Sequence, residues 1–359
     1  MSRHAVVLMN LGGPDRPESV RPFLFNLFKD PAIIRLPAVL RLPLAHLIAK
    51  RRAPLAREIY AHLGGGSPLL ALTQAQAQAL EAAIGEAETR VFVAMRYWHP
   101  MSLEVASAVK DWDPADITLL PLYPQYSTTT TASSLTDWRK SAAAVGLKAP
   151  SRAVCCYPTA PGLIAAQVAS IREALAKGPA GRKTRVLFSA HGLPRKVIRA
   201  GDPYKVQVER TADAIVRDLG DESLDWSVCF QSRVGPLEWI GPSIDQELQR
   251  AADHKVETVV IVPIAFVSEH SETLVELDIE YRKRAEALGI STYVRVPALG
   301  VQPLFIGALK ELVIQVRHRG GPIGSQAGTR LCPDWCGGCP LKNAGSGAAL
   351  NTDPIVVGA

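Results

Sequence analysis

Four glutamates recur at helical spacing within residues 257–284, just after a short apolar run that is typical of a buried strand. On a helical wheel, Glu269, Glu272, Glu276 and Glu280 share one stripe. The first three have no Lys or Arg four residues later, so their mutual repulsion is not relieved within the helix. A solvated helix face is the competing interpretation. The stripe begins at the carboxyl end of a strand, where open α/β sheets place their ligands, and this favours a functional role.

A histidine stands in a comparable place earlier in the chain. His191, in the run SAHGLP, directly follows a buried apolar segment and precedes a Gly-x-Pro turn. A lone histidine is more often structural, but this position predicts a side chain in a cleft, as a base or a metal ligand. His270 competes for the same role, and its place in a turn leaves its direction open.

Eight short apolar segments, separated by helix-length stretches, must position these side chains. They are residues 5–11, 90–97, 117–123, 153–158, 185–194, 226–236, 257–266 and 292–300. Continuous apolar runs are typical of parallel strands buried on both faces. The sequence therefore predicts an α/β fold of two Rossmann-like halves, each a four-stranded parallel sheet flanked by helices, with a cleft between them. We place the N-terminal half and its apolar lip at 1–160, the C-terminal half at 161–318, and a linker, Cys-rich extension and disordered tail at 319–359.

Three cysteines in the extension have the spacing of a metal or iron–sulfur site. Cys332, Cys336 and Cys339 are separated by three and two residues, and Pro340 follows. Such sites usually have four thiolate ligands. The fourth could come from any of the remaining cysteines, Cys155, Cys156 or Cys229. A structural zinc site is the alternative.

The composition is that of an ordinary soluble globular protein, with 47% hydrophobic and 21% charged residues. The formal net charge of +6 is a mild excess that suits an anionic small molecule or an anionic membrane surface. The sequence has no stripe of Lys and Arg interleaved with aromatic residues, so nucleic-acid binding is not indicated. No signal peptide is expected, so we predict a cytoplasmic protein whose cysteines serve metal or redox chemistry.

A bulky apolar segment with four prolines, residues 21–52, ends in Lys50, Arg51 and Arg52. The prolines predict short helical pieces. Apolar side chains beside a basic cluster indicate either core packing or a lip that contacts a membrane surface or an apolar ligand.

Read together, these stretches resemble the ferrochelatase family, whose members insert ferrous iron into protoporphyrin to make protohaem. The blocks that carry the resemblance are LGGP, AKRRAP, GGGSP, RYWHP, YPQYS, SAHGLPRKVIRAGDPY, QSRVGPLEWIGP and PIAFVSEHSETLVELDIEY, in the family's order. The match extends to about Leu312. The resemblance implies two Rossmann-like halves enclosing a porphyrin cleft, which agrees with the repeat of strands.

The resemblance also implies roles for individual residues. His191 and Glu272 match the family's catalytic and metal-binding pair, and Glu269, His270, Glu276 and Glu280 match a proton or metal path to solvent. The residues that match the porphyrin-binding positions are Leu11, Arg52, Tyr60, Ser67, Arg96, Tyr97, Tyr123 and Trp239. Leu11 stands where coproporphyrin-using relatives have Tyr, which favours protoporphyrin IX as the substrate.

For the cysteines, the resemblance implies a 2Fe-2S cluster. In animal members the fourth thiolate comes from the YPQYS segment, but here Thr128 follows it. Cys156, or Cys155, is therefore the expected fourth ligand beside Cys332, Cys336 and Cys339, and Cys229 is expected to be a core thiol.

The expected partners are protoporphyrin IX and ferrous iron as substrates, and no nucleic acid. Peripheral contact with the inner membrane at its cytoplasmic face, and a homodimer, are further expectations. The alternatives are a tetrapyrrole chelatase for another divalent metal, or a non-catalytic porphyrin carrier or iron–sulfur sensor. The presence of both His191 and Glu272 argues against a non-catalytic protein.

Overall fold

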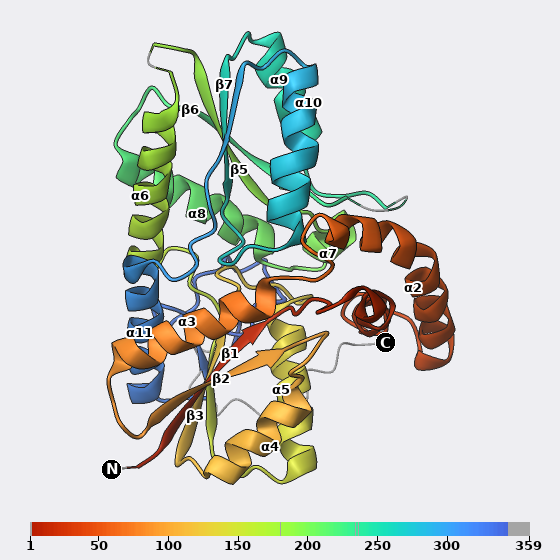
Figure 1. Cartoon of the computed structure of the whole chain (residues 1–359). Helices are drawn as coiled ribbons and strands as arrows, with labels where there is room; N and C mark the ends of the chain where they lie inside the picture. Colours follow the sequence, from red (N-terminus) through yellow and green to blue (C-terminus); the bar gives the residue numbers. More distant parts are fainter. Residues whose placement is uncertain (1, 180, 234, 236, 344–359) are drawn as a thin grey trace.

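Two parallel β-sheets, each covered by helices on both faces, form the body of the protein (Figure 1). The structure is a computed structural model that describes residues 2–179, 181–233, 235 and 237–343. The predicted disordered tail lies outside these residues except for Asn343.

The first sheet has the strand order β2-β1-β3-β4-β9, and all of its pairings are parallel. Its strands are β1 (His4–Asn10), β2 (Thr89–Met95), β3 (Asp116–Pro121), β4 (Ser151–Val154) and β9 (Ile323–Gly324). The first four were predicted. β9 was not, because two residues within a Gly-rich stretch carry no strand pattern; they pair with Ala153 and Val154 at the edge of β4. The extension therefore completes the first sheet.

The second sheet has the order β6-β5-β7-β8, again parallel throughout. Its strands are β5 (Thr184–His191), β6 (Asp225–Gln231), β7 (Thr258–Pro263) and β8 (Thr292–Arg295). β5 and β7 lie side by side at its centre, and every residue of β7 is buried. The continuous apolar runs that predicted a parallel sheet follow from this burial on both faces. The predicted fold class is confirmed.

Helices connect the strands, and most of them bury their apolar faces on the sheets. They are η1 (Pro17–Ser19), α1 (Val20–Phe28), α2 (Ala38–Ala61), α3 (Leu69–Ile84), α4 (Ser102–Trp112), α5 (Thr131–Val145), α6 (Pro161–Lys177), α7 (Arg195–Arg199), α8 (Tyr204–Leu219), α9 (Ile244–Asp253), η2 (Glu272–Glu280), α10 (Tyr281–Ala287) and α11 (Pro303–His318). On the first sheet, α3, α6 and α11 cover one face and α4 and α5 the other. On the second sheet, α6 and α8 cover one face, and α9, α10 and η2 the other.

The two halves are joined by packing as well as by the chain. α11 follows the last strand of the second sheet, yet its Phe305 and Leu309 are buried against the first sheet. Gln76 of α3 donates to the carbonyl oxygens of Val267 and Gly300, at 3.0 Å each, in the other half. The boundaries after residues 160 and 318 stay predictions, and α11 lies spatially with the first half.

The predicted lip is an arm formed by α1 and α2 that stands away from the body (Figure 1). The prediction of short helical pieces is wrong for α2, which runs for 24 residues through Pro43 and Pro54. Each proline removes a donor to the carbonyl four residues earlier. Those residues, Val39 and Lys50, are exposed, so water can hydrogen-bond the freed carbonyls. Within the described part of the chain, no helix has the length and apolar character needed to cross a membrane.

Candidate active site

A direct side-chain contact at the predicted site joins His191 to Glu272. His191 ends β5, and Glu272 begins η2 after β7, the strand next to β5. Because neighbouring parallel strands end at the same edge of a sheet, the two side chains meet there. His191 Nδ1 lies 2.8 Å from Glu272 Oε2. Their side chains keep 38% and 25% exposure, so the pair is reachable from outside.

The electrostatics of this pair favour an imidazolium beside a carboxylate. Burial alone would lower the pKa of His191, but the facing Glu272 carboxylate outweighs it and the pKa is raised. Burial alone would raise the pKa of Glu272, yet His191 lowers it to about 2.

His270 lies behind Glu272. Its Nε2 is 4.0 Å from Glu272 Oε2, its Nδ1 faces the Ser268 carbonyl oxygen at 3.2 Å, and its ring packs on Phe266. Burial lowers the pKa of His270 despite Glu272, so this ring favours the neutral form.

Glu276 continues the row of carboxylates one turn after Glu272. Its oxygens accept from the Ser232 backbone N–H at 2.8 Å, the Ser232 hydroxyl at 2.6 Å and the Gln231 amide at 2.9 Å. Burial and the Glu272 carboxylate raise the pKa of Glu276. Glu280, one turn further, is exposed. The three glutamates thus run from the buried pair to the surface.

The helix that carries them differs from the prediction. The spacing predicts an α-helix, but Glu272–Glu280 forms a π-helix, whose hydrogen bonds span five residues. Long π-helices are rare and occur often at functional sites. The spacing of apolar residues does not distinguish the two helix types over nine residues, so the sequence carried no signal for this feature.

Glu269 is placed apart from the other three glutamates. It precedes the helix, so the wheel did not apply to it. Its Oε1 accepts from Arg295 Nη1 at 2.8 Å and from the Ala298 N–H at 2.9 Å. Its Oε2 is buried without a hydrogen-bond partner among the described residues. Burial opposes ionisation, but Arg295 lowers the pKa of Glu269 overall.

Several residues predicted to bind porphyrin lie close together in the first half. The turn at Leu11 brings Gly13 against Ser67, whose backbone N–H donates to the Pro14 carbonyl at 2.7 Å. A Cβ at Gly13 would lie 2.6 Å from Ser67 Oγ and 3.9 Å from the Tyr60 hydroxyl. Leu11 and Tyr60 share one apolar cluster. Tyr60 also reaches the second half, where its hydroxyl interacts with Ser271, next to Glu272.

Arg52 is a half-buried cation in the same region. Its guanidinium lies over the Phe28 ring at 5.7 Å and has no carboxylate partner among the described residues. Burial lowers its pKa. An unpaired, partly buried arginine is suited to a ligand carboxylate.

Arg96 and Tyr97 are engaged within the protein. Arg96 Nη2 and the Tyr97 hydroxyl each lie 2.8 Å from Asp30 Oδ2, and Ser133 donates to the same oxygen at 2.5 Å. Tyr97 is only 1% exposed and Asp30 only 4%. The structure therefore places these two predicted porphyrin contacts in a buried polar network around Asp30, a residue that the sequence did not single out.

Tyr123 and Trp239 are half-buried, and each has a polar atom without a hydrogen-bond partner among the described residues. Trp239 lies beside His191, because its ring would be 3.4 Å from a Cβ on Gly192. Its indole N–H is one such atom, and the Tyr123 hydroxyl is the other. Buried donors of this kind usually have a partner, which a ligand can supply.

Comparison with known proteins gives this site a family. The ferrochelatase family model matches residues 3–317. A ferrochelatase from Caulobacter vibrioides is 53% identical over 347 residues, covering 95% of this chain and 98% of the relative. The chain belongs to the ferrochelatase family. A ferrochelatase from Pelagibacter ubique is 49% identical over 320 residues, covering 87% and 91% of the two chains. Among solved structures, SirB from Bacillus subtilis with Fe3+ has a TM-score of 0.52 at 12% identity, covering 88% of this chain and 96% of SirB, and supports the fold.

In this ferrochelatase-family chain, the three cysteines of the extension lie in one buried cluster with Cys155 and Cys156. The Cys155 and Cys156 sulfurs are 3.5 Å apart. Cys229 lies elsewhere, in the core of the second sheet. Among the side chains that the structure describes, no three His, Cys, Asp or Glu are arranged to hold a metal ion.

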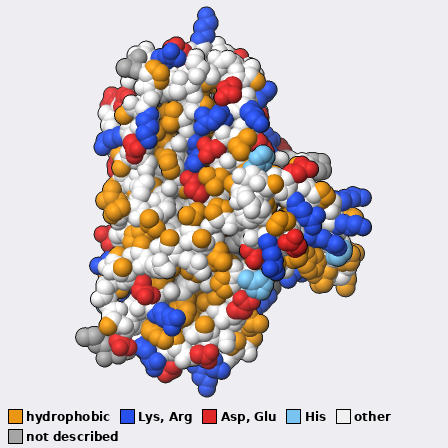
Figure 2. Space-filling model, in the orientation of Figure 1, with side chains coloured by type: hydrophobic (Ala, Val, Ile, Leu, Met, Phe, Trp, Pro, Cys, Tyr) orange, Lys and Arg blue, Asp and Glu red, His pale blue; other side chains and the backbone are white. Residues whose placement is uncertain are grey.

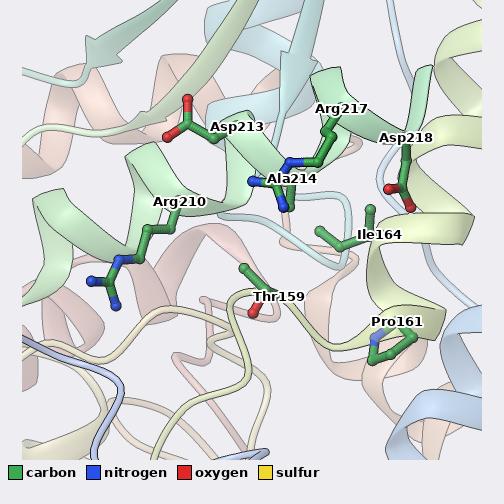
Figure 3. Close-up of a pocket in the computed structure, with 8 residues that line it drawn as sticks. All are labelled: Thr159, Pro161, Ile164, Arg210, Asp213, Ala214, Arg217 and Asp218. Atoms are coloured by element: carbon green, nitrogen blue, oxygen red, sulfur yellow. The ribbon is translucent and has the colours of Figure 1, made fainter. Parts of the chain in front are cut away.

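A cavity of about 520 Å³ opens elsewhere, between α8 and the start of α6 (Figure 3). Its charged lining residues are Arg210, Asp213, Arg217 and Asp218, all on α8. Both signs of charge are represented equally, and no residue is shared with the site around His191. The cavity is not part of the active site.

Proposed function

We propose that the protein inserts ferrous iron into protoporphyrin IX and forms protohaem, the last step of haem synthesis. The observation that carries the proposal is the contact between His191 and Glu272 at the joined ends of β5 and β7, within a chain of the ferrochelatase family.

Insertion releases two pyrrole protons while the ion loses its waters. The raised pKa of His191 favours its protonated form, so the imidazole must release a proton along the row of carboxylates before it can accept one from a pyrrole or bind the ion. Glu276, with its raised pKa, can receive the proton next, and exposed Glu280 can pass it to water. The same row can admit a hydrated cation in the opposite direction.

The porphyrin is held from the first half of the protein. Arg52 offers a half-buried guanidinium without a carboxylate partner in the described chain, which suits a propionate. Tyr60 and Ser67 lie near each other around Gly13 and can add hydroxyl donors. Trp239, beside His191, supplies an apolar wall near the reacting centre.

A 2Fe-2S cluster is part of the proposal. What supports it is the kind of donor and its grouping: Cys332, Cys336, Cys339 and the Cys155–Cys156 pair lie in one buried cluster, in which Gln207 donates to the Cys332 sulfur at 3.1 Å. Cys156 is the proposed fourth ligand, with Cys155 the alternative. A bound cluster would supply electron-transfer or structural chemistry, and metal insertion itself requires no electron.

The arm of α1 and α2 is proposed to touch the cytoplasmic face of the inner membrane. Val39 and Leu40 are 79% and 59% exposed on α2, and Lys50 and Arg51 are exposed on the same helix. Figure 2 shows Lys and Arg side chains gathered on this projecting arm beside hydrophobic ones. Such a surface suits an anionic membrane and an insoluble porphyrin. A homodimer stays a prediction.

The test is anaerobic incubation of the protein with ferrous iron and protoporphyrin IX, followed by porphyrin fluorescence and haem absorbance. We expect catalytic protohaem formation, abolished in His191→Ala while porphyrin still binds. Porphyrin binding without insertion of any divalent ion would favour a carrier or sensor. Turnover only with another metal would favour a different chelatase.

A further inference from the structure

Arg295 lies between two carboxylates that flank the catalytic segment. It ends β8, and its side chain is 10% exposed. Nη1 donates to Glu269 Oε1 at 2.8 Å, and Nε lies 2.8 Å from Asp278 Oδ2. One buried guanidinium therefore forms ion pairs in two directions.

The two partners stand on either side of the glutamates that face the site. Glu269 comes three residues before Glu272, and Asp278 comes two residues after Glu276. The backbone of Arg295 is held in the second sheet, because β8 pairs in parallel with β7. Arg295 thus ties both ends of the segment that carries Glu272 and Glu276 to one point on the second sheet.

Neighbouring contacts support the same attachment. The backbone N–H of Ala298 donates to Glu269 at 2.9 Å. Tyr293, two residues before Arg295 on β8, donates its hydroxyl to the Leu277 carbonyl in η2 at 2.8 Å. Arg295 is the charged member of this set, and besides the two carboxylates its Nη1 lies 3.4 Å from the Val296 carbonyl oxygen.

The acidic side chains therefore divide into two groups. Glu272 and Glu276 face His191, Gln231 and Ser232, whereas Glu269 and Asp278 face Arg295. Asp278 also lies 3.7 Å from Arg282, whereas Arg295 is the cation paired with Glu269. Loss of Arg295 would therefore leave the half-buried Glu269 carboxylate without its cation and Asp278 with Arg282 alone, which favours a shift of both side chains and of η2 with them.

We propose that Arg295 is a positioning residue for metal insertion: its bridge between Glu269 and Asp278 holds η2 so that Glu272 stays in contact with His191. The role rests on the proposed function. Arg295 does not contact the reacting atoms, and it acts through Glu272.

The first test compares kcat and KM for protohaem formation in Arg295→Gln, Arg295→Lys and the wild type. Displacement of a catalytic group by about 1 Å can reduce the rate on the order of 100-fold, so we expect kcat of Arg295→Gln to fall roughly 10- to 100-fold with little change in the porphyrin KM. Arg295→Lys can pair with one carboxylate at a time and should recover part of the loss. Arg284→Gln is the matched control, because Arg284 pairs with Asp245 on α9, at 3.6 Å, away from the site.

The second test monitors the contact between His191 and Glu272, by following the pH titration of ¹⁵N-labelled His191 with NMR. His191 faces Glu272, with Glu276 and His270 beyond it. If Arg295 positions Glu272, the His191 titration moves to lower pH in Arg295→Gln and stays unchanged in Arg284→Gln. Should Arg295→Gln fail to fold, Glu269→Gln/Arg295→Gln is measured instead, because it removes the cation together with Glu269 and leaves Asp278 beside Arg282.

Wild-type kcat and an unshifted His191 titration in a folded Arg295 variant would overturn the inference. A wild-type protein that forms no protohaem would instead overturn the proposed function. In that case the His191 titration still decides whether Arg295 positions Glu272.

Discussion

Gln231 holds Glu276 in place through its side-chain amide, which donates to Glu276 Oε2 at 2.9 Å and to the Glu272 backbone carbonyl at 3.1 Å. Gln231 ends β6, so a third strand end joins those of β5 and β7 at the site. The segment that carries Glu272 and Glu276 is therefore contacted directly by Gln231 of β6 and, through Glu269 and Asp278, by Arg295 of β8.

The hydroxyl of Ser232 tunes the pH dependence of the proposed proton path. Burial raises the pKa of Glu276, and the Ser232 hydroxyl, at 2.6 Å, opposes that rise. In Ser232→Ala the pKa of Glu276 rises further, so the carboxylate is protonated at higher pH. We expect the acidic limb of the kcat profile to move to higher pH, with kcat at pH 6 lower by roughly 2- to 10-fold.

The pH profile of Ser227→Ala provides the control. Ser227 lies on β6, the strand that Ser232 follows, and its hydroxyl donates to Glu247 at 2.8 Å. An acidic limb that shifts equally in both variants would show that Glu276 is not the group being titrated.

The sequence predicted that His191 and the glutamate stripe lie just past strand ends, where α/β folds place their ligands, whereas the pairing of His191 with Glu272 was implied by the family resemblance. It did not predict the partners that fix the pair. Arg295 and Gln231 each end a strand as well, but one arginine or glutamine among many has no pattern of its own. Their role depends on which strands are neighbours in the sheet, and the local pattern of apolar residues does not predict strand order.

Other features were missed for different physical reasons. The prolines of α2 predicted breaks, but an exposed arm lets water replace the lost hydrogen bonds, so the helix continues. The π-helix accepts hydrogen bonds at its carbonyl oxygens from Gln231 of β6 and Tyr293 of β8, contacts that no local pattern predicts. Asp30 lies in a short connection after α1, and only the fold brings it to Arg96 and Tyr97.

Asp30 is expected to matter for stability more than for porphyrin contact. It is 4% exposed and accepts from Arg96, Tyr97 and Ser133. Asp30→Ala leaves a buried guanidinium without its main partner, which typically costs about 3–5 kcal/mol of unfolding free energy. Urea unfolding measures the loss. Asp137→Ala is the control, because Asp137 is 30% exposed and 3.5 Å from Arg96, and it should cost less than about 1 kcal/mol.

The cysteine cluster predicts which thiols hold iron. Cys336→Ala should remove the brown chromophore and the bound iron and sulfide, whereas Cys229→Ala, in the core of the second sheet, should keep both. Cys155→Ala and Cys156→Ala separate the two fourth ligands, since only one should abolish the visible spectrum. Iron analysis and absorbance of anaerobically purified protein measure the result. A full chromophore in every variant would contradict the proposed ligand set.

Gly13 is predicted to shape the porphyrin site by having no side chain. A Cβ there would lie 2.5 Å from the Cβ of Ser67, so Gly13→Ala must displace Ser67. Because Ser67 is proposed to contact a propionate and not the reacting centre, the porphyrin KM should rise, roughly 10-fold for a lost hydrogen bond to a charged group, while kcat changes little. Gly307→Ala is the matched control, since a Cβ at this position in α11 meets no atom within 4 Å. Steady-state kinetics with varied porphyrin at saturating ferrous iron measures both constants. A fall in kcat at unchanged KM in Gly13→Ala would place Ser67 with the catalytic pair instead of the propionate.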